Sequence, residues 1–233
     1  MDWRKIFACL SIVALTCFAC CPAAEVTTPE TPVTLRQIKR DTVRDIREKT
    51  VALVQQSDEG NFLPYCSGVW VGQIEIVTAL HCVVDEDMNV TGKVIYRVSE
   101  LDKVGGEAVL KYFDFENDLV LLSATGDTTP SHGIATLASE AWQGQNVMIV
   151  GHTGGLWWTY TEGVVSSIRT ATGDLGNQRI LIQVSGPIWY GNSGGGVWDE
   201  KGRLLGISSM ISGNIPNVGF FIHFKHINDI IRQ

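Results

Sequence analysis

The chain has 233 residues, 45% of them hydrophobic, which suffices for one globular domain or for two half-domains that share a core. Its formal net charge is −7, with 18 basic against 25 acidic side chains. An acidic surface repels phosphate, so this balance argues against nucleic acid as a partner.

The first 21 residues have the pattern of an export signal, because two basic residues precede an apolar run at residues 6–21. The run is short for a membrane-spanning helix, which needs about 20 residues. Two outcomes stay open. Residues 18–21 resemble a bacterial lipoprotein box, in which a lipid on Cys20 or Cys21 tethers the protein to a membrane. Alternatively, the signal is cleaved and the protein is released. Either outcome predicts an exported protein, secreted or in the cell envelope.

Residues 22–34 are rich in Pro and Thr and lack periodicity, which is typical of an extended tether. The next segment, residues 35–49, has a helical pattern because Leu35, Ile38 and Ile46 can share one face. Its many cations leave open a membrane-surface helix. Three acidic residues dilute that charge, so we expect a helix docked on the domain with a solvated outer face.

From residue 50 the pattern changes to short strands rich in Val, Ile and aromatic residues, separated by Gly, Asn and Asp. Strands at this spacing predict an all-β barrel or sandwich. Residues 223–232 then close the chain as a helix. The first set of strands is expected at residues 51–55, 67–71, 74–79, 93–98, 108–113 and 119–123, and the second at residues 146–150, 157–168, 179–184, 195–198, 203–211 and 218–222.

The main candidate for chemistry is the serine in the motif Y-G-N-S-G-G-G at residues 190–196. The flanking glycines allow backbone conformations that other residues avoid, so the segment Gly191, Asn192 and Ser193 could form an oxyanion hole, with the amides of Gly191 and Ser193 pointing at one spot. A hydroxyl is a poor nucleophile without a base and a group that orients the base. His81 follows one apolar run and Asp118 precedes another, and they supply both.

The chain order His81, Asp118, Ser193, with an A-x-H-C box and a G-N-S-G-G box, resembles the chymotrypsin-fold serine endopeptidases. This order differs from those of the subtilisin and α/β-hydrolase triads. The resemblance implies that His81 is the general base, that Asp118 holds its tautomer and that Ser193 attacks a peptide carbonyl. Asn192 stands where digestive members have an Asp that pairs with a new N-terminus, so we expect no activation by N-terminal insertion.

The same resemblance implies two six-stranded antiparallel β-barrels with the active site between them, an N-terminal helix and a C-terminal helix. The protease domain is expected at residues 35–233, with barrel 1 at about 50–125 and barrel 2 at about 140–222. His81 and Asp118 fall in the first barrel and Ser193 in the second.

Several boxes are closer to the bacterial HtrA/Deg-like branch than to digestive trypsins. The resemblance covers about residues 43–231, and no length remains after residue 233 for a PDZ domain, so we do not expect HtrA-style peptide sensing. His152 stands where that branch has Asn, and we expect a loop residue rather than a catalyst. The boxes are V-G-H-T-G-G-L at 150–156, T-E-G-V-V-S at 161–166, the stretch 183–193, and N-V-G-F-F-I at 217–222.

Cys66 and Cys82 are expected to form a disulfide that ties down the histidine loop and contributes about 3 kcal/mol of stability. Two buried free thiols are the alternative. The histidines are scattered without ligand-like spacing, so no metal or other cofactor is expected.

The partners implied by the resemblance are protein or peptide substrates, and the oligomeric state stays open. No carboxylate lies among the expected substrate-binding residues, which argues against a preference for Lys or Arg and favours an apolar P1 residue of small or medium size. The strand at 208–210 is expected to pair with the substrate backbone. A catalytically silent binding module and an esterase remain as alternatives. The expected substrate-binding residues are Ile188, Trp189, Tyr190, Ser208, Ser209 and Met210.

Overall fold

The computed structural model describes residues 34–85, 89–98, 105–125, 133–172 and 176–233. The expected export signal, its lipid-bearing cysteines and nearly all of the tether lie outside the described residues. None of the described helices is both long and apolar enough to cross a bilayer.

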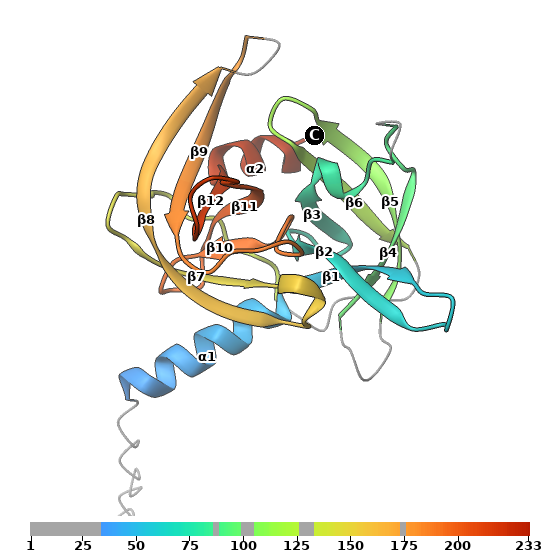
Figure 1. Cartoon of the computed structure of the whole chain (residues 1–233), viewed down its shortest axis with the longest axis horizontal. Coiled ribbons are helices and arrows are strands. Elements are labelled where there is room, and N and C mark those ends of the chain that lie inside the picture. Colours follow the sequence, from blue (N-terminus) through green and yellow to red (C-terminus); the bar gives the residue numbers. More distant parts are fainter. Residues whose placement is uncertain (1–33, 86–88, 99–104, 126–132, 173–175) are drawn as a thin grey trace, which may run out of the picture. The chain divides into compact units, whose positions relative to one another are not determined.

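Two closed barrels of antiparallel strands lie side by side (Figure 1), as the sequence predicts. In the first barrel the strands follow the order β1-β2-β3-β6-β5-β4. Closure pairs the outer strands of the sheet and so removes exposed sheet edges. The strands are β1 Thr50–Gln56, β2 Phe62–Trp70, β3 Glu75–Ala79, β4 Lys93–Arg97, β5 Gly105–Asp114 and β6 Leu119–Thr125.

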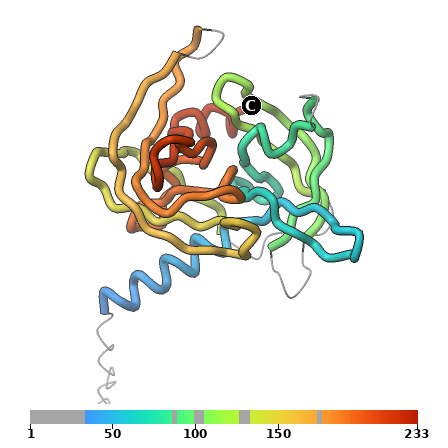
Figure 2. The backbone as a smooth tube through the Cα atoms, in the orientation of Figure 1, coloured from blue at the N-terminus to red at the C-terminus, as the bar shows by residue number. Residues whose placement is uncertain are grey.

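The second barrel has the strand order β10-β11-β12-β9-β8-β7. Its β8 and β9 form a long hairpin that extends beyond the rest of the barrel (Figure 2). The strands are β7 Asn146–Gly151, β8 Thr159–Thr172, β9 Gln178–Ser185, β10 Gly196–Trp198, β11 Leu204–Ile211 and β12 Val218–His223.

Three apolar clusters account for the packing. One fills barrel 1, with Leu53, Trp70 and Tyr96 fully buried, and another fills barrel 2 around Phe221. The third joins residues of both barrels, so the interface between the barrels is itself a core. Each large apolar side chain that is fully buried stabilises the fold by about 1.5–3 kcal/mol. Loops that meet at this interface are therefore attached to tightly packed strands.

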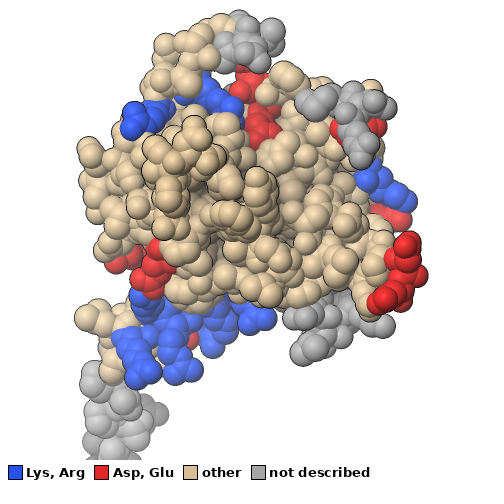
Figure 3. All heavy atoms as spheres, in the orientation of Figure 1, with Lys and Arg blue, Asp and Glu red and all other residues tan. Residues whose placement is uncertain are grey.

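The two helices flank the barrels as expected. Helix α1 (Leu35–Glu48) begins at Thr34, whose hydroxyl accepts a hydrogen bond from the amide of Gln37 at 3.2 Å, and it buries Ile46 in the shared core. Its Lys and Arg side chains gather on the outer face (Figure 3), which agrees with a docked helix that has a solvated face. Helix α2 (Phe224–Ile231) packs its apolar side into the same core.

The largest difference from the expected strand bounds is at β2, which begins at Phe62 rather than at Ser67. Pro64 argues against a strand there, because it has no amide to donate. The structure accommodates it beside a β-bulge, where only β1 pairs with this end of β2. The extension brings the β2 residues that follow Pro64 up to the candidate site.

Candidate active site

Two loops at one end of barrel 1 bring His81 and Asp118 together. His81 lies in a short 3-10 turn, η1 (Leu80–Cys82), directly after β3, and Asp118 lies directly before β6. Because β3 and β6 are antiparallel neighbours, with Ala79 paired to Leu119, the end of one strand meets the start of the other. This register explains how residues far apart in the sequence become neighbours.

The Asp118 carboxylate holds both the ring and the backbone of His81. His81 Nδ1 lies 2.9 Å from Asp118 Oδ2 and 3.2 Å from Oδ1, and the His81 amide donates to Oδ1 at 3.0 Å. A carboxylate only accepts hydrogen bonds, so Nδ1 carries the proton and Nε2 stays free as an acceptor. Asp118 has a left-handed backbone with φ of 53°, a conformation that Asp tolerates better than most residues.

Two further side chains extend this pair and were not predicted from the sequence in these roles. The Ser209 hydroxyl donates to Asp118 Oδ2 at 2.5 Å, and Arg179 donates to the Ser209 oxygen at 3.0 Å. Burial alone would raise the pKa of Asp118, but the hydrogen bonds and charge of His81 and the bond from Ser209 outweigh it and lower the pKa. Asp118 is therefore a carboxylate at neutral pH.

Ser193 lies in the tight loop before β10. Gly191 has φ of 91°, and a side chain there would collide with the backbone of the neighbouring loop. Among the described residues, the amides of Gly191 and Ser193 donate no hydrogen bond, so both are available to a ligand. The Asn192 amide donates to the Trp189 carbonyl at 3.2 Å, so it is not a third donor.

Strand β2 holds this loop through Ser67, a role that the sequence analysis missed. The Ser67 amide donates to the Ser193 carbonyl at 2.8 Å, and the Ser67 hydroxyl donates to the Gly191 carbonyl at 2.8 Å. The same oxygen lies 2.9 Å from His152 Nδ1 and accepts the His152 amide at 3.2 Å. Ser67 directly follows a cysteine of the expected disulfide, which is the one sequence signal that could have pointed to it.

His152 lies in a loop, as expected, but it is completely buried. Its ring packs edge-on against Trp157 and Trp158, whose own rings stack on each other. Burial lowers the pKa of His152 to about 3, so the ring is neutral at physiological pH. No pattern in the sequence predicts a buried polar network here.

A cleft of about 380 Å³ contains both His81 and Ser193. Ser193 and His81 make no direct hydrogen bond in the described part of the chain, and such bonds often tighten only when a substrate binds. Ile188 differs from the other expected substrate-binding residues, because it is buried in the core of barrel 2 against Gly219. The cleft is lined by Tyr65, Cys66, His81, Trp189, Tyr190, Gly191, Ser193, Ser208, Ser209, Met210 and Ile211.

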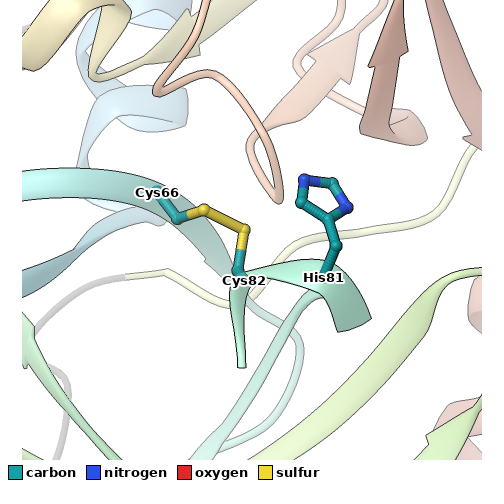
Figure 4. Close-up of side chains that lie close together, drawn as sticks. All are labelled: Cys66, His81 and Cys82. Atoms are coloured by element: carbon teal, nitrogen blue, oxygen red, sulfur yellow. A yellow bond between two sulfur atoms is a disulfide. The ribbon is translucent and has the colours of Figure 1, made fainter. Parts of the chain in front are cut away.

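The sulfur atoms of Cys66 and Cys82 lie 2.04 Å apart, at bonding distance, beside the turn that carries His81 (Figure 4). Ligand atoms of these three residues lie within 4.8 Å of one another. Sulfurs bonded to each other would have no thiolate to offer a metal.

Comparisons with known proteins agree with the fold and the boxes. Residues 66–207 match the family described as trypsin-like peptidase domain. The chain is 29% identical over 97% of its length to protease Do-like 1, chloroplastic, of Arabidopsis thaliana, and 28% identical over 68% to serine endoprotease DegS of Haemophilus influenzae. It spans about half of these relatives, 55% and 46% of their lengths.

Two solved structures share the fold at lower identity. The active form of the Rv3671c protease from M. tuberculosis has a TM-score of 0.68 at 18% identity, covering 90% of this chain and 93% of that one. The HtrA-type protease AlgW with a tripeptide has a TM-score of 0.67 at 23% identity, covering 83% and 62%.

Proposed function

The chain belongs to the trypsin-like peptidase domain family, and we propose that it is an exported serine endopeptidase. The observation that carries the proposal is the arrangement of His81. Its Nδ1 is held by the Asp118 carboxylate, which leaves Nε2 as a free base in the cleft that Ser193 also lines.

The proposed reaction passes through an acyl-enzyme. His81 Nε2 takes the proton of the Ser193 hydroxyl as that oxygen bonds to the substrate carbonyl carbon. The carbonyl oxygen becomes an oxyanion, which the free amides of Gly191 and Ser193 stabilise. The protonated His81 then donates to the leaving amine and the C–N bond breaks. Water next attacks the acyl carbon while His81 takes its proton, the ester bond to Ser193 breaks, and the proton returns to the Ser193 oxygen.

The proposed substrates are proteins or peptides with an apolar P1 residue of small or medium size. The cleft walls include Trp189, Tyr190 and Met210, and among the described residues that line it there is no Asp, Glu, Lys or Arg. Ser208–Met210 belong to β11, which we propose pairs with the substrate backbone as an added strand. A cleavage profile from a peptide library that is dominated by Lys or Arg at P1 would contradict this part.

We further propose that the protein acts outside the cytoplasm, with Cys66 and Cys82 joined as a disulfide. The export-signal pattern at residues 1–21 supports this compartment, and disulfides persist in oxidising compartments. A lipid on Cys20 or Cys21 would hold the domain near a membrane through the Pro/Thr-rich tether. Mass spectrometry of the protein purified from its host decides between a lipidated and a simply cleaved N-terminus.

The test of the activity is reaction with a fluorophosphonate, read by mass spectrometry, with Ser193→Ala as the control. We expect a single adduct on Ser193 and none in the control, because only an activated hydroxyl beside an oxyanion hole reacts readily. A folded wild-type protein that forms no adduct would overturn the proposal in favour of a silent binding module. Adduct formation with turnover of esters but not of peptides would indicate an esterase.

A further inference from the structure

Three consecutive peptide groups form the loop that precedes Ser193, and two of them are fixed by the backbone alone. The Tyr190 carbonyl accepts the Gly154 amide at 2.7 Å, and the Asn192 carbonyl accepts the Gly195 amide at 2.8 Å. In a trans peptide the C=O and the N–H point in opposite directions. Each of these carbonyl bonds therefore fixes the direction of the N–H in the same peptide group. The amides of Gly191 and Ser193 point away from the carbonyls of Tyr190 and Asn192, respectively.

The middle peptide group, between Gly191 and Asn192, is held by the backbone at one end and by a side chain at the other. Its N–H donates to the Trp189 carbonyl, whereas its C=O accepts, among the described residues, only from the hydroxyl of Ser67, and Ser67 in turn contacts His152. Rotation of this middle group changes the backbone angles on both sides of it. The two donor amides would then no longer converge on one point.

The hydrogen positions in this chain of contacts follow from its partners. A carbonyl cannot donate, so the Ser67 proton points to Gly191, and the Ser67 oxygen must accept from His152 Nδ1–H. His152 Nε2 is buried without a partner among the described residues. In this tautomer it carries no proton, so the buried atom without a partner is an acceptor and not an N–H donor. The opposite tautomer would leave a buried N–H on Nε2 without a partner among the described residues, and Nδ1 would compete with the Gly191 carbonyl for the single Ser67 proton.

We infer that His152 is a positioning residue, which acts through Ser67 to hold the Gly191 carbonyl and thereby keeps the amides of Gly191 and Ser193 aimed at the substrate oxyanion. This inference rests on the proposed function. His152 touches neither the cleft nor the reacting atoms, so it affects the rate only through the shape of the loop. A neutral donor at position 152 is required, and Asn would supply one, whereas Phe would keep a ring and remove the donor.

The test compares Ser67→Ala, His152→Phe, their double variant and His152→Asn in the otherwise unchanged protein. With a chromogenic peptide, Ser67→Ala and His152→Phe should each lower kcat by about 10- to 100-fold and leave KM within about threefold. The double variant should be no slower than the slower single variant, because both changes break one chain of bonds. His152→Asn should recover most of the lost rate.

Folded variants with kcat near that of the wild type, or losses that add in the double variant, would overturn the inference. If His152→Phe does not fold, Ser67→Ala decides, because it deletes one oxygen and leaves the ring in place.

A measurement without turnover separates this inference from the proposed activity. In NMR spectra of uniformly labelled protein, the amide signals of Gly191 and Ser193 should shift or broaden in Ser67→Ala and in His152→Phe. Unchanged signals would overturn the positioning role even in an active enzyme. A wild type that forms no fluorophosphonate adduct would overturn the activity, while the spectra would still decide the role of His152.

Discussion

The two loops that carry the proposed catalytic groups are fixed by adjacent residues of one strand, but by different chemistry. Cys66 points to the histidine loop, where its sulfur lies at bonding distance from Cys82. Ser67 points to the serine loop, where it holds the carbonyls of Gly191 and Ser193. Successive side chains of a strand point to opposite sides, so β2 can serve both loops at once.

The difference lies in what each attachment depends on. The proposed Cys66–Cys82 disulfide would be a covalent attachment, which a reductant would remove. Ser67 packs against a buried neutral His152. Acid would add a proton to His152 Nε2, which has no partner among the described residues, so protonation would destabilise the packing around Ser67. The loop that carries His81, the histidine side, should therefore respond to reductant. The loop that carries Ser193, the serine side, should respond to pH.

The strongest challenge to the histidine side is Asp118→Asn. An amide can donate to His81 Nδ1 and so favours the tautomer with the proton on Nε2, which cannot accept from Ser193. We expect kcat to fall by about 10⁴-fold with little change in folding stability. Peptide hydrolysis at neutral pH, with Ser193→Ala as the background rate, measures it. A loss of about tenfold or less would mean that Asp118 does not orient the base.

Removal of the covalent attachment by the double change Cys66→Ala and Cys82→Ala should lower the free energy of unfolding by about 3 kcal/mol. The closed loop disappears from the unfolded state, whose chain entropy rises. Urea denaturation measures the change. Wild-type protein in reductant should show a similar loss, and a reduced protein as stable as the oxidised one would mean that the bond does not form.

On the serine side, acid should destabilise the fold through His152. The unfolded histidine binds a proton near pH 6.5, whereas folded His152 does so only near its pKa of about 3. Between these values the unfolded state binds more protons than the folded state. The contribution of His152 to the free energy of unfolding is therefore complete above about pH 6.5, and it falls as the pH falls, by about 1.4 kcal/mol per pH unit at most.

Urea denaturation from about pH 7 to about pH 4 checks this, with His152→Asn as the matched control. His223 has a pKa lowered to about 4, first by burial, and contributes in the same direction, but it is present in both proteins and cancels. Equal pH slopes in the two proteins would contradict the assignment of a neutral buried ring.

The smallest expected effect comes from Arg179→Met. Arg179 donates to the Ser209 hydroxyl, which donates to the Asp118 carboxylate, so Arg179 supports the group that orients His81. Without that support kcat should fall by about two- to fivefold, because one hydrogen bond behind the carboxylate is lost. Arg169→Met, which removes an exposed arginine of the same hairpin, is the control. An equal loss of rate in both variants would show a general charge effect.

The sequence predicted the strands and the helices well because their signals are local. Hydrophobic runs and Gly or Asn breaks mark β1, β6 and β7 within a few residues of their ends. The start of β2 was missed because Pro64 argues against a strand, and the bulge that accommodates it leaves no pattern. For the fold as a whole, the order of three short boxes carried more information than the strand count.

The parts of the site that the sequence could not predict are contacts across the barrels. Ser67 and His152 are 85 residues apart, and Arg179 and Ser209 are 30 apart. No spacing rule connects such pairs, because they meet only through the register of closed sheets. Ile188 was expected at the cleft because it directly precedes Trp189 and Tyr190. Its side chain instead packs in the core of barrel 2 beside Gly219.

The left-handed backbone of Asp118 narrows the changes that evolution can make at this position. Most side chains would strain that turn, whereas Asn, Asp and Gly accept it. A descendant that lost its activity here would thus tend to carry Asn or Gly and keep its fold, ready to recover the carboxylate later. We expect inactive relatives that keep this loop to carry Asn or Gly at the position of Asp118.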